Sequence, residues 1–272
     1  MRKFLVTKMD GTWQAYNHDK VIHSITATGL ALALAEKIAA KVESKLFNKI
    51  TTRELYRLVA QEIKNLGSPR QHSLYRLREA LSELDSIKFE EYLAEILTAY
   101  GYQTEWNKLI RGAAVEHQVD VVAKKGAEDW LIEIKHHVDW HKMSGLGQVL
   151  QIQARLEDIQ EGFRQGKNQF NFTGVWLINN TKFSDHAKAY ATYHKIRLSG
   201  WHYSDQPQFS LENLIQQKGL YPVTILDIPV ALKNLLQSKN LVTLNDLLKT
   251  KQRFRMNYSW SELLNKAQAI IQ

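Results

Sequence analysis

Cysteine is absent from the 272-residue sequence, and this absence excludes several kinds of chemistry. The chain can form no disulfide, cannot use a thiolate nucleophile, and cannot hold zinc or an iron–sulfur cluster through cysteine ligands. Long apolar runs are also missing, because the longest one, residues 29–35, is far shorter than the roughly 20 residues that cross a bilayer. No basic and then apolar export signal opens the sequence, so we expect a soluble cytoplasmic protein with no membrane partner.

Several catalytic and cofactor motifs are missing as well. Without a phosphate-binding loop that ends in Gly-Lys-Ser or Gly-Lys-Thr, hydrolysis of a bound nucleotide is not indicated. The sequence has no Gly-x-Ser-x-Gly or His-Glu-x-x-His motif, and the Gly-Leu-Gly at 145–147 is too short for a dinucleotide fingerprint. His136, His137 and His141 could suggest zinc, but adjacent strand residues point to opposite faces and further ligands are not evident. We therefore expect no zinc site.

Charge is distributed unevenly along the chain. Residues 1–84 carry 14 basic and 8 acidic side chains, residues 85–222 carry 15 and 17, and residues 223–272 carry 7 and 3. Two basic ends around a slightly acidic centre fit a protein that handles a polyanion, although three solvated surfaces of different composition would give the same counts. Together with the positions of the prolines, the pattern predicts three domains, at 1–85, 86–222 and 223–272.

The first segment is predicted to be a small α+β domain. Residues 4–8 and 12–16 have the composition of two short strands, and the Asp-Gly pair between them favours a hairpin turn. Helical periodicity then follows over residues 19–46, from Thr51 or Thr52 onward, and over residues 69–84.

The stretches at 6–11, 17–21, 50–55 and 74–77 resemble the ATP-cone, the regulatory nucleotide-binding module of ribonucleotide reductases and of their repressors. Lysine suits phosphate, and the backbone of a hairpin turn can approach a ligand closely at glycine. The family usually has Arg where this chain has Met9, which leaves nucleotide affinity or choice open. A helical dimerisation domain with incidental lysines is the alternative.

The resemblance implies a regulatory site for ATP or dATP. Lys8 and Lys20 would lie near the phosphates, and Val6 and Val21 would flank the base. The full set of residues that it implies is Val6, Lys8, Met9, Gly11, Asn17, Lys20, Val21 and Thr52.

The second segment combines an amphipathic helix with two strands. The helix covers residues 89–100, and its Glu90 leans toward the apolar face. Strands are predicted at 115–123 and 130–137, joined by a hairpin around Gly126.

Three charged side chains meet on these otherwise apolar strands. An antiparallel hairpin that turns near residue 126 pairs Asp120 closely with Glu133, and strand alternation places Lys135 on the same face as Glu133. Such groups are rarely buried without a purpose, so the trio is the strongest local indication of a functional site.

An Asp followed one strand later by Glu-x-Lys resembles the PD-(D/E)xK nucleases, and the flanking sequence resembles their Mrr-like restriction endonuclease branch. The match extends from Phe89 through 112–120 and 131–135 to the Gly-Leu-Tyr-Pro at 219–222, nearly all of the second segment. The resemblance implies a restriction-endonuclease-like α/β domain with a mixed sheet. Val119 stands where the motif's name has Pro, which is a mild variation.

The same resemblance implies a Mg²⁺ or Mn²⁺ site. Asp120 and Glu133 are hard oxygen ligands, and the backbone carbonyl of Ile134 would be a further ligand. Lys135 would orient or deprotonate a water and stabilise the transition state, and Glu90 would complete the metal shell from the helix. Accessory positions are Gln148 and Gln151, on a helix expected over 144–163, and His117.

The third segment is predicted to hold three short amphipathic helices, at 228–238, 243–250 and 259–271. Basic side chains between the last two helices suggest a phosphate-backbone contact of helix–hairpin–helix type. A solvated capping bundle explains the same pattern.

These features predict a multi-domain α/β protein that acts as a nucleotide-regulated, divalent-metal-dependent DNA endonuclease, a phosphodiester hydrolase. Its partners would be double-stranded DNA and an adenine nucleotide. Because one active site cuts one strand, we expect a homodimer or a larger assembly. The alternative is a nucleotide-responsive DNA-binding regulator that uses the nuclease fold without cleavage, and the intact trio argues against it.

Overall fold

In the computed structural model, which describes residues 4–272, the chain divides into two units. The first contains residues up to 77, together with 225–228 and 251–272, and the second contains 78–224 and 229–250. The C-terminal residues 223–272 are thus shared between the two units. The domain limits at 85 and 222 stay a prediction.

The first unit contains the predicted hairpin. β1 (Leu5–Thr7) pairs antiparallel with β2 (Trp13–Ala15) across a turn in which Gly11 has a φ of 80°, a value that favours glycine. β3 (Ile50–Thr51) was not foreseen, and it pairs parallel to β1 on the other side. A strand of two residues leaves no periodic signal in the sequence.

Helices complete the first unit, and the predicted helix over 69–84 is divided in two. Caps fix where they begin: Asn17 accepts a hydrogen bond from the backbone N–H of Lys20 at 2.8 Å, and Thr51 and Glu54 form a capping box. The helices are α1 (His18–Thr26), α2 (Leu32–Glu43), α3 (Thr52–Leu66), α4 (Pro69–Tyr75) and α12 (Trp260–Ile271), with α5 (Leu77–Ser82) at the start of the second unit. The core of the first unit is formed by α1, α2 and α3 together with β1 and β3, and includes Val6, Val21, Ile25, Ile38, Val42, Ile50, Val59 and Ile63.

The second unit is built on a six-stranded mixed sheet in the order β11-β10-β8-β6-β5-β4. β4, β5 and β6 are antiparallel, β6, β8 and β10 are parallel, and β11 returns antiparallel. The mixed sheet that the sequence predicts is confirmed. The strands are β4 (Gln103–Arg111), β5 (Glu116–Lys125), β6 (Glu128–Lys135), β8 (Gly174–Asn179), β10 (Arg197–Gly200) and β11 (Tyr203–Ser204).

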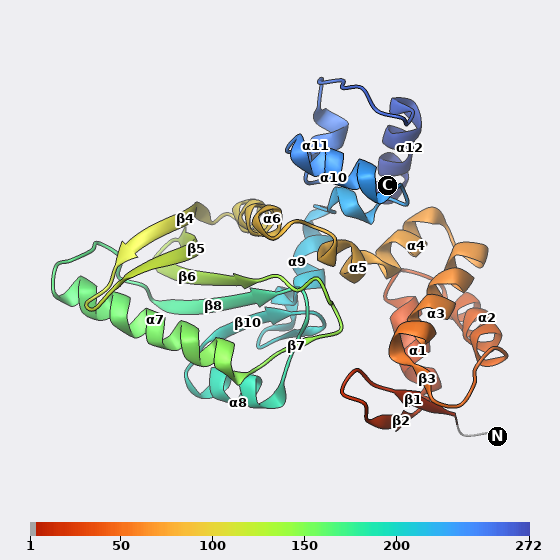
Figure 1. Ribbon diagram of the computed structural model, residues 1–272, viewed down its shortest axis with the longest axis horizontal. Coiled ribbons are helices and arrows are strands. Elements are labelled where there is room, and N and C mark those ends of the chain that lie inside the picture. Colours follow the sequence, from red (N-terminus) through yellow and green to blue (C-terminus); the bar gives the residue numbers. More distant parts are fainter. Residues whose placement is uncertain (1–3) are drawn as a thin grey trace. The chain divides into compact units, whose positions relative to one another are not determined.

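Helices cover both faces of this sheet (Figure 1). α7 (Leu146–Arg164) and α8 (Asp185–Tyr193) pack on one face, where Val149 and Ile152 of α7 share a core with Leu131 and Leu177 of the sheet. α6 (Ser86–Ala99) lies on the other face, with α9 (Leu211–Lys218) beside it. Short elements complete the unit: β7 (Met143–Ser144), β9 (Lys182–Phe183) and 3₁₀ turns at Pro207–Phe209 and Val223–Ile225.

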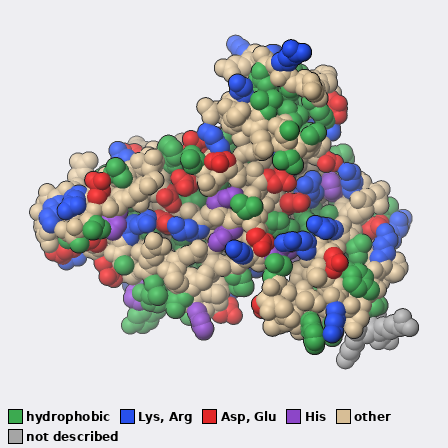
Figure 2. Space-filling model, in the orientation of Figure 1, with side chains coloured by type: hydrophobic (Ala, Val, Ile, Leu, Met, Phe, Trp, Pro, Cys, Tyr) green, Lys and Arg blue, Asp and Glu red, His purple; other side chains and the backbone are tan. Residues whose placement is uncertain are grey.

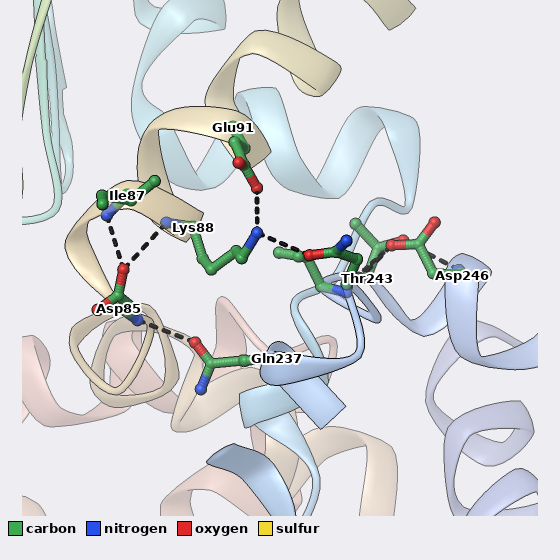
Figure 3. Close-up of polar contacts among 9 residues, drawn as sticks. Asp85, Ile87, Lys88, Glu91, Gln237, Thr243 and Asp246 are labelled. Carbon is green, nitrogen blue, oxygen red and sulfur yellow. Dashed lines mark hydrogen bonds and ion pairs between the residues drawn. The ribbon is translucent and has the colours of Figure 1, made fainter. Parts of the chain in front are cut away.

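The C-terminal helix α10 (Val230–Ser238) and the loop between it and α11 (Leu244–Lys249) are bonded to the start of α6 (Figure 3). Gln237 accepts a hydrogen bond from the backbone N–H of Asp85 at 2.9 Å, and the ammonium of Lys88 donates to Asn240 at 2.8 Å. The buried Lys233 also pairs with Glu83 at 2.5 Å. These polar contacts explain why residues 229–250 belong to the second unit.

Two glycines of α7 give a matched test of how the helix packs. A Cβ on Gly162 would lie 2.7 Å from the backbone carbon of Gly112, whereas a Cβ on Gly147 would meet nothing within 4 Å. We expect Gly162→Ala to lower the free energy of unfolding by about 1–3 kcal/mol through overpacking. Gly147→Ala should raise it by about 0.5 kcal/mol through helix propensity. Urea unfolding followed by circular dichroism checks both, and equal effects would contradict the close approach at Gly162.

Candidate active site

The strands on both sides of Asp120 separate from β5 at its position. Pairing between β5 and β6 runs from the turn to Val121 opposite Ile132 and ends there, and the same register would next place Asp120 opposite Glu133. β4 pairs with β5 before and after Asp120 but is interrupted beside it, where Asn107 has a φ of 53°. The sheet therefore has a gap at the predicted acidic residue.

Asp120 and the backbone of Ile134 meet at this gap. The Asp120 Oδ2 atom accepts a hydrogen bond from the N–H of Ile134 at 2.7 Å. Because the N–H and C=O of one strand residue leave the backbone toward the same neighbouring strand, the Ile134 carbonyl is directed to the same side. An aspartate oxygen and a main-chain carbonyl oxygen therefore face the same gap between β5 and β6, where both could bind one ligand.

Glu133 is 3% exposed and binds two cations. The ammonium of Lys135 lies 2.5 Å from Oε1, and the guanidinium of Arg155, which comes from α7, donates to Oε2. A buried carboxylate is costly unless it is paired and hydrogen-bonded, and here a cation meets each of its oxygens.

The pKa values of the two other carboxyl groups in this cluster are raised. Burial, and then the negative charge of Glu133, raise the pKa of Asp120 to about 7, against a lowering effect of its bond from Ile134. Burial also raises the pKa of Glu90 on α6, while a hydrogen bond with the Trp106 side chain acts in the opposite direction. Glu90 and Asp120 both interact electrostatically with Glu133, so the structure brings the predicted acidic residues into one cluster.

The donor set suits a cation that keeps part of its water shell. Among residues 4–272, no group of three or more His, Asp and Glu side chains is arranged to hold a metal ion by itself. Asp120, Glu133 and the carbonyl of Ile134 could supply three oxygens, and Mg²⁺ commonly completes its shell with waters and a phosphate. The Oε1 atom of Gln148 is buried and has no hydrogen-bond partner within the described chain, which leaves an acceptor for a water or a ligand.

The accessory positions differ in their surroundings. The Nε2 atom of His117 lies 2.7 Å from the Asp158 carboxylate of α7, which also accepts a hydrogen bond from the N–H of Ala114 at 2.8 Å. His117 thus helps to anchor the loop before β5 to the helix. Gln151 is exposed on α7, while Gln148 is half-buried.

The sequence patterns did not reveal Arg155 or Trp106. Arg155 follows Gln151 by four residues and Gln148 by seven, a spacing that places all three on one helix face and could have indicated it. Trp106 lies on β4, which is exposed along most of its length and so lacks the apolar alternation by which a strand is identified.

The predicted nucleotide residues of the hairpin differ in exposure. Val6 on β1 and Val21 on α1 belong to one core and are 9% and 7% exposed, so a base could touch only the edges of these side chains. Lys8 and Gly11 are joined by a 3.0 Å backbone hydrogen bond that closes the turn, and Met9 between them is 52% exposed.

The remaining nucleotide residues lie at helix starts. The side-chain oxygen of Asn17 caps α1 at the N–H of Lys20, which leaves its NH₂ group free to donate elsewhere. Thr52 begins α3, and its hydroxyl donates to the carbonyl of Thr7 on β1 at 3.0 Å. Asn17 and Thr52 therefore have structural contacts of their own.

Charges of both signs cover the second unit. On the face that Figure 2 shows, Lys and Arg side chains lie among Asp and Glu rather than forming a field of one sign. In the described part of the chain, no helix is both long enough and apolar enough to span a bilayer.

Comparison with known proteins defines the class of each part. Residues 4–87 match the family of ATP cone domains. Residues 81–200 match the family of Mrr-type catalytic domains, which is described as restriction endonuclease. An uncharacterized protein of Archaeoglobus fulgidus is 35% identical over 156 residues, which cover 57% of this chain and 83% of that protein. A crystal structure of a protein of unknown function is 31% identical with a TM-score of 0.56, and the match covers 69% of this chain and 98% of the other.

The chain therefore joins an ATP-cone domain to a restriction-endonuclease-like domain. It belongs to the Mrr-like restriction endonuclease family and carries an ATP-cone domain at its N-terminal end, as the sequence predicts.

The raised pKa of Asp120 predicts a pH-dependent stability. From the ordinary value of 3.8 up to about 7, the folded protein holds a proton that the unfolded chain has lost. The free energy of unfolding therefore falls as the pH rises through this window. Asp120→Asn cannot ionise, so we expect it to be more stable than the wild type at pH 8 by about 1–2 kcal/mol, allowing for solvent screening, and equally stable at pH 5.

Urea unfolding at pH 5 and pH 8 measures this difference. Asp185→Asn is the control, because the Asp185 side chain is 95% exposed. The same effect of Asp120→Asn at both pH values would contradict the raised pKa.

Proposed function

We propose that the protein is a nucleotide-regulated, divalent-metal-dependent endonuclease that hydrolyses phosphodiester bonds in double-stranded DNA. One observation carries the proposal: Asp120, Glu133 and Lys135 gather where β5 and β6 separate, inside a restriction-endonuclease-like fold. A solely structural role does not explain a half-buried Asp120 whose pKa is raised by burial and by the charge of the buried Glu133 beside it.

Asp120, Glu133 and the Ile134 carbonyl would hold a Mg²⁺ or Mn²⁺ ion. When bound, such an ion neutralises the scissile phosphate and lowers the pKa of a water ligand. The strand register supports this set, because it places the Asp120 oxygen against the backbone of Ile134, next to Glu133.

Lys135 would act on the attacking water and the phosphate. Its ammonium is held by Glu133 at 2.5 Å, and its side chain is 31% exposed, so it can donate both to the carboxylate and to a substrate oxygen. Glu90 faces the same cluster from α6 and would accept a hydrogen bond from a water of the site.

The accessory residues would act at longer range. The unpartnered oxygen of Gln148 would accept a hydrogen bond from a bound water, and the exposed Gln151 would meet the substrate. His117 would act through the loop that it and Asp158 anchor. The basic side chains between α11 and α12 stay a predicted contact with the DNA backbone.

The ATP-cone would bind ATP or dATP and regulate the nuclease. Lys8 and Lys20 would contact the phosphates, with Met9 and Gly11 in the adjoining turn and Asn17 and Thr52 at the two helix starts, while Val6 and Val21 would touch the base. A double-strand break needs two active sites or two events, so a homodimer or a larger assembly would be the acting form. The protein would act on double-stranded DNA in the cytoplasm.

Loss of either charged residue should abolish cleavage. Without Asp120 the proposed ion loses a ligand, and without Lys135 the water loses its donor. We therefore expect Asp120→Ala and Lys135→Ala to lower the rate of plasmid cleavage in Mg²⁺ or Mn²⁺ by a factor of about 10³ or more. Asp185→Ala and Lys188→Ala are matched controls, because they remove an exposed Asp–Lys pair at 3.1 Å in the same unit.

The outcomes of the cleavage assay distinguish the functions. Cleavage that persists in both site variants would contradict the site. A wild-type protein that binds DNA in the presence of Mg²⁺ and nucleotide without cutting it would favour the DNA-binding regulator.

Nucleotide binding should depend on Lys8. Removing one charge-assisted contact to phosphate should weaken ATP or dATP binding about 10- to 100-fold in Lys8→Ala, as measured by isothermal titration calorimetry. Lys37→Ala, on the exposed side of α2, is the control and should bind as the wild type does. Unchanged affinity in Lys8→Ala would remove Lys8 from the site.

A further inference from the structure

Arg155 is a cation of the active-site cluster to which the proposed reaction gives no role. It lies at the middle of α7, and its side chain is 17% exposed. Its Nη1 atom donates to Oε2 of Glu133, while Lys135 holds Oε1. Both oxygens of Glu133 are therefore engaged, and a divalent ion that approaches either oxygen meets the positive charge of a cation already bound there.

The positions of the two cations in the fold favour Arg155 as the one that gives up its bond to Glu133. Lys135 lies two residues after Glu133 on the same strand, so its ammonium stays near the carboxylate whatever else binds. Arg155 reaches in from a different element on a long side chain, and can turn away without moving β6. Its guanidinium has five N–H donors in a planar fork, which suits the oxygens of a phosphodiester.

The charge balance of the site indicates that Arg155 stays in it after leaving Glu133. The cluster contains three carboxylates, those of Glu90, Asp120 and Glu133, and two cations. One divalent ion and one phosphodiester would bring the full set to four negative and four positive charges, provided that both Lys135 and Arg155 remain in the site. A buried site that lost Arg155 when DNA bound would hold excess negative charge.

We propose that Arg155 exchanges partners. It neutralises Glu133 while the carboxylate has no metal ion, is displaced from Oε2 when a divalent ion binds, and then donates to the scissile phosphate. The proposal deepens the proposed nuclease function and rests on it. It makes Arg155 a catalytic residue in contact with the substrate, and a competitor of the metal ion in the absence of DNA.

Metal binding without DNA tests the first half of the exchange. Removing the competing cation should make Arg155→Ala bind Mn²⁺ about tenfold more tightly than the wild type in isothermal titration calorimetry. Arg155→Lys keeps the charge and should bind Mn²⁺ as the wild type does. Arg164→Ala is the matched control, because Arg164 lies on the same helix and pairs with Glu161 on the exposed surface.

Kinetics and DNA binding test the second half. In saturating Mn²⁺, Arg155→Ala should lower kcat about 100-fold, and its affinity for a short DNA duplex in Ca²⁺ should fall about tenfold, since a charge-assisted contact to phosphate is lost. Arg155→Lys should recover part of the DNA affinity but little of kcat, because an ammonium lacks the planar fork.

Two results would overturn the exchange. Mn²⁺ binding in Arg155→Ala that is unchanged or weaker would show that Arg155 only positions Glu133. Full recovery of kcat by excess metal would show the same. If Arg155→Ala does not fold, Arg155→Met takes its place in each measurement, and the same criteria apply.

The two proposals fail separately. A wild-type protein that cuts no DNA in Mg²⁺ or Mn²⁺ would contradict the nuclease function. The Mn²⁺ titration would still decide whether Arg155 competes with a metal ion for Glu133.

Discussion

A carboxylate buried to 3% exposure, that of Glu133, must be matched by positive charge, and this requirement organises the second unit around the gap in its sheet. Lys135 supplies one cation from the same strand and Arg155 the other from α7, so the strand and the helix that covers it are tied together through one side chain. The surrounding carboxyls respond to the same charge, which contributes to the raised pKa of Asp120. The proposed metal ion and phosphodiester would enter a site whose charges are already held in this way.

The two units are built from interleaved pieces of the chain. The backbone passes between them after residues 77, 224, 228 and 250, so neither unit is a continuous segment. Lys64 pairs with Asp227 at 2.8 Å within the first unit, and the hydroxyl of Thr224 donates to the carbonyl of Ala80 at 2.6 Å within the second. Both predicted domain limits, after residues 85 and 222, fall within the 78–224 segment of the second unit.

The sequence predicted those features that have a local signal. The β5–β6 hairpin has strand composition on both sides of Gly126, and its register follows from the turn. The proximity of Asp120 to Glu133 could therefore be predicted by counting residues from the turn along each strand. The helix starts followed from capping residues such as Asn17 and Thr51. β4 could not be found in this way, because its exposed edge position removes the need for apolar alternation. Arg155 was missed because its partner lies 22 residues away on another element.

The sequence by itself determined the two family resemblances, the order of the modules and the acidic pair beside Lys135, because motifs and strand alternation are properties of neighbouring residues. Only the tertiary structure decided which strands leave Asp120 at a gap, which cations meet Glu133, and how the C-terminal helices are divided between the units. These outcomes depend on burial and on charges brought together from distant parts of the chain. Burial and long-range electrostatics are set by packing, and no single stretch of sequence encodes them.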